Sequence, residues 1–312
     1  MPTRYTNLPD NKNKIYGGAY SVHDEELCAY RDLIINNFTL TNNYSVENAE
    51  LIKSNFVDTY KTWMFSTHNM KGAGDYTEAC FTNGTTESFY QFYLRYKDTR
   101  RLRIAKGEYF FHQMMKSLWY PAARFAWLDE DEIRSDDVIL ISVPFSDSCT
   151  LPENLDDLLT KCDKLGVPVM LDFAYLNISL GLKVDLTHPC IEYIVSSLSK
   201  VFPVENHRIG IRLQREKFED QLYVINETNY NYINLLSAYL GTQMMKKFAA
   251  DYVYNKYRRD QIMMCESLEL EVADCVYFGI DHNNQYGEYN RGTATNRLCF
   301  SRLWDGRMQY DV

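Results

Sequence analysis

Short apolar runs alternate with helix-like segments between residue 50 and about residue 225, and this alternation constrains the fold more than any other feature of the chain. A short apolar run bounded by turn residues is typical of a strand that is buried on both faces. The predicted strands cover residues 102–105, 138–142, 167–171, 191–195 and 209–213. We therefore predict an α/β fold with a mainly parallel sheet sandwiched by helices.

The segment 152–165 is the clearest of the predicted connecting helices. Apolar residues recur along it at helical spacing, and Gly166 follows at the position where a glycine commonly ends a helix. The next predicted strand ends just before Asp172. Open α/β sheets bind their ligands at the carboxyl ends of the strands, so Asp172 is a candidate site residue.

The pattern changes toward both ends of the chain. Residues 1–50 are polar apart from one helical stretch and are predicted to form an N-terminal arm and helix that belong to a small domain. Residues 51–228 form the predicted large domain. Residues 229–264 contain no proline and a single glycine, which predicts a long linking helix. Residues 265–312 hold two β-like runs around a Gly/Asn-rich loop, and we expect a small α+β cap there.

Charge and composition exclude several classes of function. The 312 residues include 42 Asp and Glu against 33 Lys and Arg, so the formal net charge is -9 and nucleic acid and anionic lipid are repelled. No apolar stretch approaches the length of a membrane span. The eight cysteines form no C-x-x-C pair, and the histidines do not lie near paired acids. We expect a cytoplasmic protein without disulfide framework, metal, membrane or nucleic-acid partner.

Four short segments carry the candidate chemistry, and their order and spacing are more specific than any one of them. They are Thr82-Asn-Gly-Thr-Thr-Glu87, Pro144-Phe-Ser-Asp-Ser148, Asp172-Phe-Ala-Tyr175 and Ser197-Leu-Ser-Lys200 followed by Arg208. Together they resemble the aminotransferases of pyridoxal-phosphate (PLP) fold type I, in particular the class I/II and histidinol-phosphate-aminotransferase-like branch. The resemblance runs from about Phe81 to Leu213 and implies a large PLP-binding domain with a small α+β cap.

Lys200 resembles the family's lysine that forms a Schiff base with PLP. It stands just past a predicted strand, and Arg208 follows eight residues later, where the resemblance places the arginine that binds the cofactor phosphate. A partly desolvated lysine loses its proton more readily than a solvated one, which suits it to react with an aldehyde. The resemblance implies that Lys200 is both the anchor of the cofactor and the general base.

Asp172 and Tyr175 are the other predicted catalytic residues. A carboxylate at the end of a buried strand is costly unless a cation meets it. The resemblance implies that Asp172 keeps the pyridine nitrogen protonated, so that the ring accepts electrons from the substrate. It also implies that the Tyr175 hydroxyl bonds the phenolate oxygen of the cofactor.

The predicted phosphate site combines backbone amides with polar side chains. A turn precedes the helical run 86–96, and amides at a helix N-terminus favour an anion. The residues that the resemblance assigns to the phosphate site are Asn83, Gly84, Thr85, Ser197, Ser199 and Arg208.

An aromatic ring just beyond the predicted strand 102–105 is expected to stack on the cofactor. Tyr109 is our choice for this ring. Phe110, Phe111 and His112 compete with it, because any of them can instead belong to the core.

The chain departs from the family pattern at two positions of the cofactor site. Ser146 stands where the family has an asparagine that bonds the phenolate oxygen, although an alternative register places Val143 there. The usual glycine before Arg208 is also missing, and Asn206 is expected to adopt the unusual backbone angle in its place.

The C-terminal segment contains the predicted substrate-binding arginine. Residues 296–302 resemble the small-domain strand whose arginine binds the substrate carboxylate, with Arg297 as our candidate and Arg302 as the rival. The family also implies a homodimer in which a tyrosine reaches the phosphate of the neighbouring subunit. Tyr16, Tyr20 and Tyr60 are the candidates for that tyrosine.

The resemblance implies a PLP-dependent aminotransferase that moves an amino group between an amino acid and a 2-oxo acid through a Schiff base on Lys200. One alternative is another PLP-dependent reaction, such as that of a C-S lyase, a decarboxylase or a cyclase. The sequence leaves this open because the substrate bond held perpendicular to the ring decides which bond breaks. The other alternative is a non-catalytic relative that serves as a binding or regulatory subunit.

Overall fold

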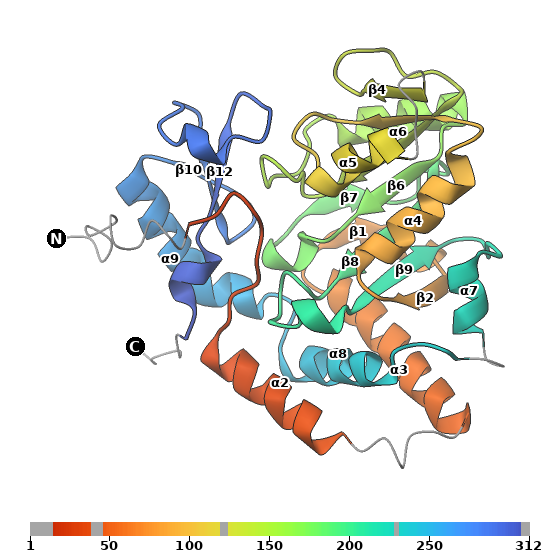
Figure 1. Ribbon diagram of the computed structural model, residues 1–312, viewed down its shortest axis with the longest axis vertical. Helices are drawn as coiled ribbons and strands as arrows, with labels where there is room; N and C mark the ends of the chain where they lie inside the picture. The colour runs from red at the N-terminus through yellow and green to blue at the C-terminus, as the bar shows by residue number, and fades with distance from the viewer. Residues whose placement is uncertain (1–14, 39–45, 119–123, 228–230, 307–312) are drawn as a thin grey trace.

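A mixed sheet forms the centre of the molecule (Figure 1). The computed structural model describes residues 15–38, 46–118, 124–227 and 231–306. Residues 1–14 of the predicted arm and 307–312 of the predicted cap lie outside the described residues. Within the described ranges the sheet has seven strands in the order β2-β9-β8-β6-β5-β3-β4.

The strands of this sheet are β2 (Glu78–Thr82), β3 (Arg101–Ile104), β4 (Phe125–Trp127), β5 (Asp137–Ser142), β6 (Val169–Asp172), β8 (Ile191–Ser197) and β9 (Gly210–Gln214). Neighbouring strands are parallel except β9, which runs antiparallel to both β2 and β8. The structure confirms every predicted strand to within one or two residues and the mainly parallel arrangement. The strands β2 and β4 were not predicted.

Both faces of the sheet are buried, and consecutive residues of one strand serve different cores. Val138 and Leu140 of β5 pack with Phe89 and Phe92 of α4 (Thr85–Tyr96) in one hydrophobic cluster. Ile139 lies in the other cluster, together with side chains of α3 and α6. A strand buried in this way reads as a continuous apolar run, which explains why its position was predictable.

The remaining helices are α2 (Glu25–Asn37), α3 (Val46–Phe65), α5 (Phe110–Leu118), α6 (Leu155–Leu165), α7 (Gln221–Asn226), α8 (Leu235–Lys247) and α9 (Tyr252–Leu268). Short 3-10 helices are η3 (Ala73–Asp75), η5 (Leu176–Ile178), η6 (Glu205–His207), η7 (Gly287–Tyr289) and η8 (Ser301–Trp304). The predicted helix at 152–165 is confirmed as α6. Gly166 ends it in the left-handed conformation, with φ of 64°.

The prediction of one long linking helix across residues 229–264 is wrong. The segment holds two helices, α8 and α9, and the chain becomes extended at Phe248 between them. The Phe248 ring packs against Phe202 and Tyr252, and its carbonyl accepts a hydrogen bond from the indole of Trp63 at 2.8 Å. Tertiary packing therefore satisfies the carbonyl that a continuous helix would have used. The domain boundaries themselves stay predictions.

The C-terminal residues form the expected small cap beside the larger part (blue in Figure 1). Its strands β10 (Glu271–Val272), β11 (Phe278–Asp281) and β12 (Asn296–Cys299) make an antiparallel sheet. The N-terminal segment before α2 joins this cap, because Tyr16 pairs with Cys299. A separate pair of parallel strands is formed by β1 (Asn69–Lys71) and β7 (Lys183–Asp185). Among the described residues, no helix is long and apolar enough to cross a membrane.

Candidate active site

A cavity of about 670 Å³ lies at the carboxyl ends of the central strands. Ser142, Asp172 and Ser197, which end β5, β6 and β8, all line it. The other walls come from residues 17–20 of the N-terminal segment and from Asn290, Arg291 and Arg297 of the cap. The cavity therefore occupies the edge of the sheet where α/β folds bind ligands, closed by two segments that are distant in sequence.

The cavity brings together most of the predicted site residues. Those that line it are Thr85, Tyr109, Ser146, Asp172, Tyr175, Ser197, Ser199, Lys200, Arg208 and Arg297. Asn83 and Gly84 do not line it. The side-chain amide and the backbone N–H of Asn83 donate to the carboxylate of Glu87, so the Asn83 side chain serves the start of α4.

Asp172 has a buried carboxyl group that accepts few hydrogen bonds in the described structure. Its side chain accepts one hydrogen bond, from the Ala174 N–H at 3.0 Å. Burial raises the pKa of Asp172 to about 8, and the negative charge of Glu108 adds to the rise, whereas the Ala174 N–H and Lys200 oppose it. A cationic hydrogen-bond donor that entered the cavity would stabilise the ionised form of this carboxyl group.

Lys200 follows β8 in a turn and directs its amine toward the N-terminal segment. Its Nζ atom donates to the carbonyl oxygen of Ala19 at 2.9 Å. Burial lowers the pKa of the Lys200 amine, Cys299 and Glu205 oppose the fall, and Arg297 and Arg208 add to it. The lowered pKa makes the neutral amine, which is the form that reacts with aldehydes and accepts protons, easier to reach.

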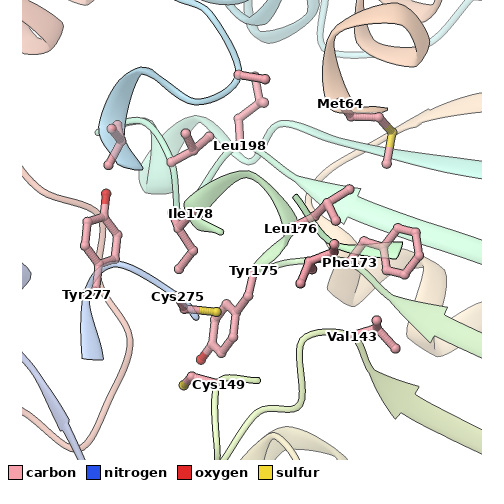
Figure 2. Close-up of a cluster of buried hydrophobic side chains, with 14 of the residues drawn as sticks. Met64, Val143, Cys149, Phe173, Tyr175, Leu176, Ile178, Leu198, Cys275 and Tyr277 are labelled. Carbon is pink, nitrogen blue, oxygen red and sulfur yellow. The ribbon is translucent and has the colours of Figure 1, made fainter. Parts of the chain in front are cut away.

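Tyr175 and Arg297 meet at the floor of the cavity. The guanidinium of Arg297 donates from Nη1 to the Tyr175 hydroxyl at 3.0 Å. Burial raises the pKa of Tyr175 to about 12, so its hydroxyl keeps its proton at neutral pH. Figure 2 shows Tyr175 among buried neighbours that include Cys149 and Cys275. The rival arginine, Arg302, does not line the cavity and donates to Asp305 in the turn after η8 instead.

Ser146 lies at the cavity wall, whereas Val143, which the alternative register proposed, is buried in the hydrophobic core. Arg291 contacts Ser146 twice: Nη1 donates to its carbonyl at 2.8 Å and Nη2 to its hydroxyl at 3.2 Å. Burial lowers the pKa of Arg291, and the nearby Arg297 adds to the effect. The sequence reasoning missed Arg291, because a lone arginine in a Gly/Asn-rich loop resembles an ordinary surface residue.

The N-terminal segment is the second part of the site that sequence reasoning missed. The carbonyl oxygens of Gly17 and Ala19 accept hydrogen bonds from Arg297 and Lys200. Backbone carbonyls give no signal in a sequence, so only the fold reveals this contact. Tyr20 lines the cavity of its own chain. Tyr60 is fully buried and donates to Ser196, so the prediction that it could cross to a neighbouring subunit is wrong.

The predicted phosphate site lies where Gly84 meets Arg208. Arg208 itself has the left-handed conformation, with φ of 54°, so the expectation that Asn206 takes this role is wrong. A Cβ atom on Gly84 would stand 2.5 Å from Nη2 of Arg208, which shows how closely the guanidinium covers the start of α4. In the described part of the chain, Arg208 has no ion-pair partner. Its guanidinium donates to the Glu205 carbonyl at 3.5 Å.

The polar groups of the cavity fit PLP. Arg208 and the unpartnered, buried hydroxyl of Ser199 are available to an anion at one end of the cavity. Asp172 offers an acceptor to a protonated nitrogen, and Lys200 offers an amine to an aldehyde. Tyr109 is 42% exposed and presents its ring at the cavity wall, where an aromatic ligand can stack.

Comparisons with known proteins agree with this site. The sequence model of the family described as aminotransferase class I and II matches residues 128–283, half of the chain. No curated protein matches the sequence. A solved structure of a probable N-succinyldiaminopimelate aminotransferase from Thermus thermophilus is similar, with a TM-score of 0.62 and 13% identity over 93% of this chain and 91% of that one.

Two further structures show the same fold. The histidinol-phosphate aminotransferase from Clostridium acetobutylicum has a TM-score of 0.59 and 12% identity, covering 91% of this chain and 95% of that one. A PLP-bound C-S lyase from Staphylococcus hominis has a TM-score of 0.60 and 13% identity, covering 80% of this chain and 76% of that one. The chain therefore belongs to the class I and II aminotransferase family and is a PLP-dependent enzyme of fold type I.

Proposed function

We propose that this protein is an aminotransferase that exchanges an amino group between an amino acid and a 2-oxo acid. The observation that carries the proposal is the convergence of Lys200, Asp172 and Arg297 on one cavity. These side chains provide an amine whose pKa is lowered, a buried carboxyl group and a guanidinium. Amino-group transfer needs a proton carrier, an acid partner for the cofactor ring and a site for a carboxylate.

The cofactor would be held mainly by groups at the ends of β6 and β8 and at the start of α4. Arg208, Ser197, Ser199 and the Thr85 amide would bind its phosphate, and Asp172 would face its ring nitrogen. Bound PLP supplies an aldehyde that condenses with amines and a ring that withdraws electrons from the substrate Cα. The chain's own residues then have to position the substrate and move one proton.

Arg297 is the proposed site for the substrate carboxylate. Its Nε atom is buried and has no partner among the described residues, although its Nη atoms are occupied by Ser146, Tyr175 and Gly17. A carboxylate that binds a guanidinium through two hydrogen bonds fixes the orientation of the bond to be broken. Arg291, beside Arg297, adds a second positive charge that favours an anionic group.

Lys200 is the proposed general base. Because burial and neighbouring cations lower the pKa of its amine, Nζ can accept a proton from the substrate Cα and deliver it to the carbon on the other side of the amino nitrogen. The Ala19 carbonyl accepts one hydrogen bond from Nζ and forms no ion pair with it. The amine can therefore exchange this partner for another. The position of Lys200 in the cavity suits a 1,3 proton transfer, and this supports aminotransfer.

We include a homodimeric assembly and a cytoplasmic location in the proposal.

The first experiment is an absorbance spectrum of the purified protein with PLP, followed by borohydride reduction and peptide mapping. We expect an imine band and a reduced cofactor adduct on Lys200. Lys200→Ala should lose the adduct and turnover, whereas Lys183→Ala, which changes an exposed lysine, should keep both. Wild-type turnover in Lys200→Ala would refute the mechanism.

A second assay separates aminotransfer from the other PLP-dependent reactions. A candidate amino acid is added without an acceptor, and the released product and the form of the cofactor are measured. Aminotransfer yields one equivalent of 2-oxo acid and leaves the cofactor in its amine form. Continuous release of ammonia with an unchanged cofactor would instead show a lyase. The similar structure from Staphylococcus hominis is named as a C-S lyase.

A further inference from the structure

Glu108 is a fully buried carboxylate to which the proposed reaction assigns no role. It accepts hydrogen bonds from the N–H of Tyr109 at 2.8 Å, from the N–H of Ser142 at 2.9 Å and from the Ser142 hydroxyl. The two backbone groups can only donate, so this arrangement satisfies an ionised carboxylate. These hydrogen bonds favour the ionised form of Glu108 against the effect of burial, and Glu108 lies one residue before the cavity wall.

The hydrogen bonds to Ser142 place this charge beside Asp172. Ser142 and Asp172 end the adjacent parallel strands β5 and β6, and their Cα atoms are direct partners. Neighbouring strands lie only about 4.8 Å apart. The Glu108 carboxyl group is thus hydrogen-bonded to the strand end next to Asp172, and burial together with the charge of Glu108 raises the pKa of Asp172.

Other charged and titratable groups face this pair from several elements. Lys200, after β8, faces Asp172 and opposes the rise in its pKa. Arg291, from the cap, faces Glu108 and favours its ionised form, although burial raises the pKa of that carboxyl group overall. Tyr60 of α3 and Tyr109 are also within electrostatic reach of Asp172, and burial raises the pKa of both phenols, so they stay neutral.

We propose that Glu108 is a positioning residue for Asp172: its carboxylate, held at the end of the neighbouring strand, adds negative charge near Asp172 and so stabilises the protonated cofactor nitrogen that Asp172 would face. The inference rests on the role proposed for Asp172. The Glu108 carboxylate also accepts hydrogen bonds from the backbone of Tyr109 and of Ser142 at the end of β5. One side chain therefore connects two residues that line the cavity.

The test measures the proton on the cofactor nitrogen directly. Holoenzyme is reconstituted with PLP that carries nitrogen-15 in its ring, and the ring nitrogen shift is followed by NMR as pH is raised. Glu108→Gln keeps the size of the side chain and removes its charge. We expect the ring proton of this variant to be lost at a pH about one unit or more below that of the wild type.

Two controls separate charge from packing. Glu108→Asp keeps the charge and shortens the side chain, so its titration should lie closer to that of the wild type than the titration of Glu108→Gln does. Glu192→Gln changes a partly buried glutamate near the amino end of β8, away from the cavity, and should leave the titration unchanged. An equal shift in Glu108→Asp and Glu108→Gln would overturn the proposal, because the effect would then come from local structure.

A third variant does not depend on Glu108→Gln folding. Glu108→Ala also removes the charge, so its ring proton should be lost at a lower pH than in the wild type. The proposal is overturned if Glu108→Gln or Glu108→Ala folds and titrates like the wild type. Release of 2-oxo acid by the wild type is measured separately. A failure of the Glu108 proposal can therefore be told apart from a failure of the proposed aminotransferase function.

Discussion

Gly84 cannot carry a side chain without displacing Arg208, and this makes Gly84→Ala a sharp test of the predicted phosphate site. Gly84 has φ of 76° and ψ of 172°, a conformation that residues other than glycine rarely adopt. An added Cβ atom would lie 2.5 Å from Nη2 and 2.9 Å from Cζ of Arg208. The guanidinium is the flexible end of a long side chain, so it moves away from the start of α4 while the fold survives.

Gly84→Ala should lower both the stability of the fold and the affinity for PLP, for different physical reasons. Backbone strain at Gly84 should lower the free energy of unfolding by about 1–3 kcal/mol. Displacing Arg208 removes a charged hydrogen bond to phosphate of about 1.5–3 kcal/mol, which weakens PLP binding by roughly 10- to 100-fold. Pyridoxal lacks the phosphate, so its affinity should change much less.

Two other glycines provide matched controls. Gly181 also has a positive φ, of 71°, but a Cβ atom there would meet no atom within 4 Å. Gly181→Ala should therefore lose stability without losing PLP affinity. Gly74 combines open space with an ordinary φ, so Gly74→Ala should change neither quantity. Thermal unfolding and titrations with PLP and pyridoxal measure these effects. A Gly84→Ala variant with the affinity of the wild type for PLP would refute the phosphate site.

Two further predictions concern the stability of the cofactor-free protein. Because the pKa of Asp172 is raised to about 8 in the folded state, its contribution to stability is complete below its ordinary pKa near 4 and is lost as pH rises toward about 8. Asp172→Asn should therefore resist urea better than the wild type at about pH 9, with a free energy of unfolding up to about 5 kcal/mol higher. At about pH 4 the difference should be much smaller. A constant difference between these pH values would contradict the raised pKa of Asp172. Arg103→Ala removes the fully buried partner of Asp137, which keeps its pair with Arg101, and should cost up to about 3 kcal/mol, whereas the exposed pair of Arg134 with Asp131 should contribute less than about 1 kcal/mol. Equal losses in Arg103→Ala and Arg134→Ala, measured by chemical denaturation, would contradict this.

The central strands were predictable because burial on both faces leaves a continuous apolar run in the sequence. The strand β4 has three residues, all partly exposed, and so lacks that pattern. The antiparallel direction of β9 depends on the path of the chain after Lys200, which an apolar run does not encode. The break between α8 and α9 has a similar cause: no proline or glycine marks Phe248, and its contacts come from distant residues such as Trp63.

The site was predictable where its residues follow the ends of strands within one motif. Asp172 and Lys200 are of this kind, because the strand that precedes each of them fixes its place at the edge of the sheet. Arg291 and Glu108 are of another kind. They reach the site through the docking of the cap and through a hydrogen bond to the neighbouring strand, and neither contact leaves a local pattern.

The arginines of the cavity differ from Arg103 in what holds them. Backbone carbonyl oxygens accept hydrogen bonds from Arg208 and Arg297 in the described structure, and Arg291 comes within 4.0 Å of a carboxylate oxygen of Asp147. By contrast, Arg103 outside the cavity is paired with a carboxylate at 2.6 Å.

A carbonyl orients a cation without neutralising it, whereas a carboxylate does both. The cavity therefore presents arginine side chains to its ligands within a chain whose formal net charge is -9. An anionic cofactor and a carboxylate substrate would be attracted to these arginines. Backbone carbonyls already orient Arg208 and Arg297, and the described structure gives neither of them a carboxylate partner, so those ligands would supply the opposite charge.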